Sequence, residues 1–160
     1  MPDFPNTLKA ISNRLTTTKG DPELLYGRVQ PQAIPLEEAV LGAIMIDKDG
    51  FPSIIEILRK ESFYVEKNQT IFQVMSELFG KSQPIDLLTV HESLKKAALL
   101  ENIGGISYLM DLTNKVGSAA NIEFHARIIA QKFIQRELIR VSTQIIHDSF
   151  EDTKDVLELL

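Results

Sequence analysis

Apolar residues after the first thirty positions recur at helical spacing instead of alternating as they would in a strand. In the segment LEEAVLGAIMID, Leu36, Val40, Leu41 and Ile44 all fall on one side of a helix. Pro35 suits the first helical position, where its missing N–H costs nothing. The pattern predicts a helix from about Pro35, and the turn sequence DKDG ends it.

Four more short helices are predicted before residue 117. They are expected around Pro52–Arg59, after a cap at Asn68, after a cap at Asp86, and after Gly104-Gly105. The residues expected to face the core, in chain order, are Ile54, Ile55 and Leu58; Ile71, Phe72, Met75, Leu78 and Phe79; Leu87, Val90 and Leu94; Ile106, Leu109 and Leu112. No segment has a convincing strand pattern. We therefore expect an all-α fold that begins with a compact bundle of about five short helices.

The segment from Ser118 to about Asp148 is much longer than the others, and no glycine or proline interrupts it. A cap at Ser118 or Asn121 can start it. About thirty residues at about 1.5 Å each give a helix of about 45 Å, longer than the roughly 30 Å width of a small domain. The pattern predicts a long helix that projects from the bundle.

The apolar residues of this long segment run along two tracks. The first consists of Ile122, Ala126, Ile129 and Phe133, and the second of Ile134, Leu138, Val141 and Ile145, widened by Ile139 and Ile146. The helical bundle can bury one track. The second needs another surface to cover it, so the pattern predicts an interaction domain with an apolar arm.

The two ends of the chain differ from the middle. Residues 1–30 are polar and rich in proline, glycine and threonine, which predicts a flexible tail with one short helical turn near Leu8–Leu15. The final EDTKDVLELL begins a new helix with a cap at Thr153 and stops in the middle of the pattern. We expect a fragment of a longer protein: a tail over 1–30, a helical head over 31–116, and a hairpin arm over 117–160 whose second helix is cut short.

Composition and charge narrow the function. The chain has 22 acidic and 17 basic residues and a net charge of −5, whereas domains that grip nucleic acid through its phosphates are usually basic. It contains no cysteine, which excludes disulfides and thiolate metal sites, and no tryptophan. No apolar run is long enough to span a membrane, so no membrane partner is expected.

Motifs of catalysis are incomplete. HESLK, at His91–Lys95, lacks the second histidine of the zinc motif HExxH, and the pair Ser93 and Lys96 lacks the companion motifs of serine–lysine enzymes. The chain contains neither a P-loop nor GxGxxG. We therefore expect no catalytic residue, bound cofactor or metal in this chain. A small helical enzyme that uses His125 or His91 with nearby carboxylates is the alternative from another class.

Several segments together resemble a known family. LEEAVLGAIMID, FYVEKNQTIFQVM, PIDLLTV, IGGISYLMDL, SAANIEFHARII and RELI occur in an order and spacing similar to the N-terminal domain of the bacterial replicative DNA helicase, the DnaB family. The resemblance covers Pro31–Leu160, and SAANI followed by RxLI, downstream of IGGxxYL, is highly specific as a set. The chain departs from the family at Asn68, where histidine is frequent, and at His125, where tyrosine is frequent.

The resemblance implies a helical head and hairpin that form a collar in a hexameric ring, as dimers or a trimer of dimers, and that dock primase. ATP and magnesium would act in a RecA-like motor domain absent here, and DNA would be contacted only by the intact helicase, in the cytoplasm at the replication fork. Apolar family positions that influence primase contact match Ile139 and Ile145, flanked by Leu138 and Ile146. The rival within this fold is the helicase-binding domain of a primase, which would lack the SAANI segment.

Overall fold

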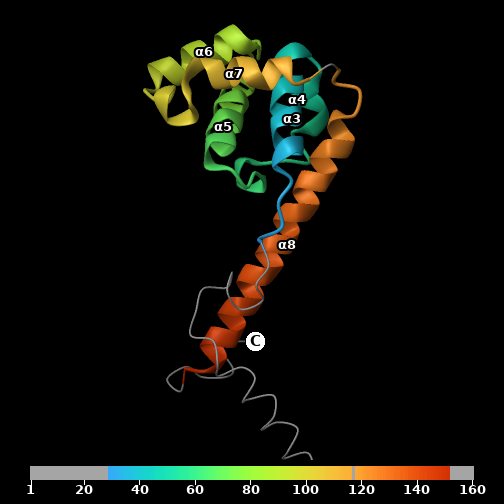
Figure 1. Ribbon diagram of the computed structural model, residues 1–160, viewed down its shortest axis with the longest axis vertical. Helices are drawn as coiled ribbons and strands as arrows, with labels where there is room; N and C mark the ends of the chain where they lie inside the picture. Colours follow the sequence, from blue (N-terminus) through green and yellow to red (C-terminus); the bar gives the residue numbers. More distant parts are fainter. Residues whose placement is uncertain (1–28, 117, 152–160) are drawn as a thin grey trace, which may run out of the picture. The chain divides into compact units, whose positions relative to one another are not determined.

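A computed structural model describes residues 29–116 and 118–151 of the chain (Figure 1). Every regular element in these residues is helical, which confirms the all-α prediction. The α-helices are α3 (Ile34–Ile46), α4 (Gly50–Ile54), α5 (Glu66–Gly80), α6 (Leu87–Lys96), α7 (Gly105–Asn114) and α8 (Ile122–Ser149). Two 3₁₀ turns accompany them, at Lys60–Ser62 and Glu101–Ile103.

The chain divides into two compact units. One comprises Pro31–Arg136, and the described part of the other comprises residues 29, 30 and 137–151. The first unit thus contains the five shorter α-helices and the first half of α8. The expected tail and the second hairpin arm, with its cap at Thr153, fall almost entirely outside the described residues.

Within the Pro31–Arg136 unit, α7 packs against α3, and α6 packs against both α5 and α7 (Figure 1). Three phenylalanine rings form the centre of the core: Phe72 lies between Phe51 and Phe63, at centroid distances of 5.5 and 4.9 Å. Side chains from every α-helix of the unit complete it. The largest fully buried ones besides these rings are Leu41, Ile44, Ile54, Ile71, Met75, Leu94, Ile103, Leu109 and Leu112.

The first track of the long helix joins this core as predicted. Ile122, Ala126 and Ile129 are buried, and Phe133 is half-buried. The guanidinium of Arg59 lies 4.8 Å from the centroid of the Phe133 ring. The first half of α8 is therefore an integral part of the unit, although the expected head ended before it.

The start of α6 confirms the predicted cap. Asp86 Oδ1 accepts a hydrogen bond from the Thr89 backbone N–H at 2.9 Å, and Thr89 Oγ1 accepts one from the Asp86 N–H at 2.9 Å. This reciprocal arrangement satisfies two N–H groups that a helix terminus otherwise leaves unpaired.

The core positions predicted for Ile55 and Ile106 are wrong, whereas the partly exposed Phe79 does contact the core, because its ring lies 5.0 Å from that of the buried Phe51. Ile55, Ile106 and Phe79 are 38%, 43% and 40% exposed. The helix predicted over Pro52–Arg59 runs only from Gly50 to Ile54, and Ile55 follows the fully buried Ile54 at about 100° further round the helix axis, so its side chain turns outward. In α7, Tyr108, two residues after Ile106, packs against the core instead.

The cap predicted at Asn68 is also wrong. Helix α5 begins at Glu66, with Val65 as the capping residue, so Asn68 lies inside the first turn. Its side chain is fully buried and bonds to residues of α3 and α7, which a cap could not reach. The buried carboxylate of Glu37 on α3 needs hydrogen-bond donors, and this need outweighs the preference of asparagine for a capping position.

Candidate protein-interaction surface

The second unit presents apolar side chains along α8. Leu138, Val141 and Ile145 are 62%, 43% and 54% exposed, and their spacing of three and four residues places them on one side of the helix. Ile146, beside Ile145, is 40% exposed, and Ile139 is half-buried. We call Leu138, Ile139, Val141, Ile145 and Ile146 the apolar face of α8. It includes all four residues predicted to contact a partner, and their binding role stays a prediction.

Polar side chains of the same stretch bond to near neighbours on the helix. Arg140 Nη2 lies 3.0 Å from Glu137 Oε2, one turn earlier, and this bond and charge raise the pKa of Arg140. Gln144 Nε2 donates to Asp148 Oδ1 at 2.8 Å. Pairs three and four residues apart stabilise a solvated helix. The polar side is thus suited to water, and the apolar face is the part of this stretch that favours a protein partner.

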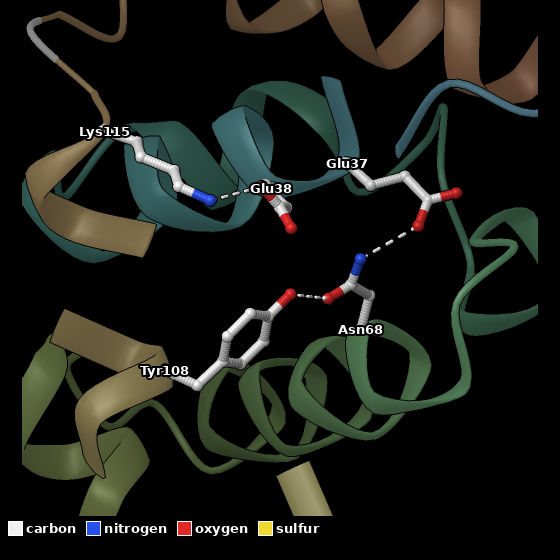
Figure 2. A network of polar contacts seen from close by, with 5 residues as sticks. All are labelled: Glu37, Glu38, Asn68, Tyr108 and Lys115. Carbon is white, nitrogen blue, oxygen red and sulfur yellow. Dashed lines mark hydrogen bonds and ion pairs between the residues drawn. The ribbon is translucent and has the colours of Figure 1, made fainter. Parts of the chain in front are cut away.

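A buried carboxylate forms the main polar site of the Pro31–Arg136 unit (Figure 2). Glu37, on α3, is 1% exposed and accepts hydrogen bonds from the Tyr64 N–H at 2.6 Å, the Val65 N–H at 3.4 Å and Asn68 Nδ2 at 3.0 Å. Asn68 Oδ1 in turn accepts from the Tyr108 hydroxyl at 2.7 Å. These contacts tie α3, α5 and α7 together and meet the need of a buried carboxylate for donors.

Charges around this network keep the Tyr108 hydroxyl protonated. Burial raises the pKa of Tyr108 above its usual range, and the nearby carboxylates of Glu38 and Glu37 raise it further. Lys115 Nζ lies 2.8 Å from Glu38 Oε2, and that bond raises the pKa of Lys115 (Figure 2). The Tyr108 hydroxyl therefore remains a donor to Asn68, and each member of the network has a structural task.

The histidines considered for catalysis are on separate elements. His91 lies on α6 beside Glu92, with Nδ1 3.5 Å from Glu92 Oε1, and His125 lies in the first half of α8. Among residues 29–116 and 118–151, no cluster of three histidine or acidic residues could hold a metal ion. No described helix is long and apolar enough to cross a membrane.

Ser93 and Lys96 line one groove along α5 and α6, of about 660 Å³. Because they are three residues apart, both lie on one side of α6. Polar and apolar side chains line the groove in similar measure, and Gln73 Nε2 within it donates to Glu77 Oε1 at 3.0 Å. Its residues come from segments remote in sequence, so no sequence pattern pointed to it.

Comparison with known proteins decides the family. Residues 29–131 match the DnaB-like helicase N-terminal domain. The chain belongs to the DnaB-like helicase N-terminal domain family. This confirms the resemblance seen in the sequence, and it favours the helicase over the primase as the source of the fold.

Relatives in this family align with most of the chain. The replicative DNA helicase DnaB of Rhodothermus marinus is 46% identical over 84% of the chain, and that of Geobacillus stearothermophilus 43% identical over 84%. The matches span 14% and 30% of those relatives. The chain therefore corresponds to a minor part of each of these two helicases.

Two solved structures share the fold. The N-terminal domain of DnaB helicase from Mycobacterium tuberculosis aligns with a TM-score of 0.78 at 32% identity, covering 82% of this chain and 92% of that one. A DnaB-like replicative helicase, described with its interactions with primase, aligns with a TM-score of 0.66 at 27% identity, covering 72% of this chain and 27% of that one.

Proposed function

We propose that this chain acts as the N-terminal collar domain of a hexameric replicative DNA helicase, where it takes part in ring assembly and docks primase during DNA replication. Membership of the DnaB-like helicase N-terminal domain family supports this role. So does the similarity to a replicative helicase whose structure was described with its interactions with primase.

The observation that carries the proposal is the apolar face of α8. Leu138 and Ile145 are more than half exposed although they are large aliphatic residues. Contiguous apolar side chains on a helix usually mark an interface, and a few of them supply most of its binding energy. We infer that this face receives another subunit or primase, with Leu138, Ile139, Ile145 and Ile146 as its contacts.

The remaining activities of the helicase are assigned to other parts of the whole protein. ATP, magnesium and DNA would be bound by a RecA-like motor domain, and this chain would carry no catalytic residue. It would work in the cytoplasm, at the replication fork. The two replicative helicases compared above, of which the matched segment spans 14% and 30%, are consistent with this division.

Replacing Ile145 with aspartate is expected to weaken primase binding at least about tenfold. The substitution places a charge within an apolar contact, where it must lose its water without gaining a partner. Isothermal titration calorimetry of the chain with the helicase-binding domain of a primase measures the effect. Ile139→Asp, at the half-buried position, should act in the same direction.

Gln144→Asp is the matched control, because Gln144 is exposed on the polar side of the same helix, where its Nε2 donates to Asp148. Its dissociation constant should stay near that of the original chain. Circular dichroism should show equal helix content in all three variants. An unchanged dissociation constant for a folded Ile145→Asp would refute the proposed contact.

The purified chain is expected to hydrolyse ATP no faster than a blank, with or without single-stranded DNA. The sequence contains no P-loop to hold the phosphates of a nucleotide. A phosphate-release assay tests this. Hydrolysis that rises with added DNA and co-purifies with the chain would contradict the division between collar and motor.

A further inference from the structure

Arg136 connects three separate segments of the Pro31–Arg136 unit. Its Nη1 donates to the Pro31 carbonyl oxygen at 2.8 Å, and its Nη2 donates to the Ser62 carbonyl oxygen at 2.8 Å. These partners are 105 and 74 residues away along the chain. One side chain on α8 therefore holds both the segment before α3 and the 3₁₀ turn before α5.

Aromatic rings support the guanidinium in this position. Its central carbon lies 5.5 Å from the centroid of the Tyr64 ring and 5.8 Å from that of Phe133. Arg59 lies over the same Phe133 ring, at 4.8 Å. Cations within about 6 Å of an aromatic face are attracted to it. Two arginines thus lie close to the Phe133 ring, and one of them, Arg136, reaches the carbonyl groups.

The segment Arg59–Val65 is consequently held from two directions. Arg136 binds its carbonyl group at Ser62, and the buried Glu37 of α3 binds its N–H groups at Tyr64 and Val65. Within the segment, the Ser62 hydroxyl accepts from the Arg59 N–H at 3.1 Å. Its backbone is therefore fixed by one cation and one anion, each on a different helix.

Arg136 also lies at the boundary between the two units of the chain. Pro31 and Arg136 are the first and last residues of the unit, so the chain passes to the other unit directly before Pro31 and directly after Arg136. The bond from Arg136 Nη1 to the Pro31 carbonyl joins these two crossing points.

We propose that Arg136 is a clasp that fastens the entry and exit of the chain to the Arg59–Val65 segment, and that can open without unfolding the core. Of the residues it joins, Pro31 is half-buried and Ser62 is a buried polar residue, and only Phe63, next to Ser62, places its ring in the apolar core. Its bonds are polar and only partly buried, whereas α5 and α7 are held by buried apolar contacts. When the clasp is open, residues 31–37 and 59–66 lose protection together.

Amide hydrogen exchange followed by mass spectrometry tests the clasp in the full chain. In Arg136→Ala, exchange in residues 31–37 and 59–66 should rise at least about tenfold, because even one hydrogen bond to a charged group changes an equilibrium constant by about that factor. Arg136→Lys keeps the charge but not the planar fork that reaches two carbonyl groups, so its increase should be smaller. Exchange in α5 beyond its first turn and in α7 should stay within about twofold.

Arg140→Ala is the matched control, because Arg140 lies on the same helix and pairs with Glu137 instead of reaching the Pro31–Arg136 unit's carbonyl groups. It should leave exchange in 31–37 and 59–66 unchanged. Two results would overturn the proposal. One is unchanged exchange in both segments of Arg136→Ala. The other is an equal rise across α5 and α7, which would make Arg136 an ordinary part of the core.

Discussion

Replacing Gly42 with alanine is expected to lower the free energy of unfolding by at least about 3 kcal/mol. A Cβ atom at Gly42 would overlap the carbonyl oxygen of Leu112 and lie 2.7 Å from Val116 Cγ2. The backbone of α7 cannot withdraw without separating it from α3, so the overlap outweighs the roughly 1 kcal/mol that alanine gains over glycine in a helix. Urea unfolding followed by circular dichroism at 222 nm measures the loss.

Gly80→Ala provides the comparison for this effect. Gly80 is the last residue of α5, and a Cβ atom there would meet nothing within 4 Å. This variant should be as stable as the original chain or slightly more stable. Equal stability of Gly42→Ala and Gly80→Ala would mean that α3 and α7 do not approach as closely as described.

Replacing Glu37 with alanine should also lower the free energy of unfolding by at least about 3 kcal/mol. It leaves the Tyr64 and Val65 N–H groups and Asn68 Nδ2 without their acceptor. Each buried donor that loses its partner costs about 1–3 kcal/mol. Glu37→Gln keeps the shape and one good acceptor oxygen, so its loss should be smaller. The same urea experiment measures both variants.

The neighbouring Glu38 serves as the control for Glu37. Glu38 pairs with Lys115, whose side chain is more than half exposed, and such surface ion pairs contribute little. Glu38→Ala should therefore destabilise far less than Glu37→Ala. If the two variants lost similar stability, the buried network would not be what holds α3 to α5.

Much of the helical pattern was predictable from local chemistry. The spacing of Val40, Leu41 and Ile44 identified the buried side of α3, and Asp86 marked the start of α6. Both features depend on residues within one or two turns of each other. Such short-range rules apply whatever the rest of the fold does.

The polar network was not predictable, because it depends on contacts across the fold. Glu37 and Asn68 are 31 positions apart, and Asn68 and Tyr108 are 40 apart. Periodicity placed Glu37 near the apolar residues of α3 but could not show that it would be buried. For the same reason, the sequence pattern predicts a cap at Asn68, and it does not indicate the hydrogen bonds of Arg136.

The candidate interface was predictable in part. The second apolar track of α8 followed from spacing alone, and the exposure of Leu138, Val141 and Ile145 agrees with it. A single chain cannot show what covers such a face, because the covering surface belongs to another molecule. The choice of primase or another subunit therefore rests on the family to which the chain belongs.

Size-exclusion chromatography with multi-angle light scattering, on the chain alone and mixed with the helicase-binding domain of a primase, tests the proposed collar role most directly. We predict that the mixture gives a new peak whose mass equals that of a complex of both proteins, and that Ile145→Asp reduces this peak while Gln144→Asp does not. Two peaks with the masses of the separate proteins, at concentrations well above micromolar, would contradict the role.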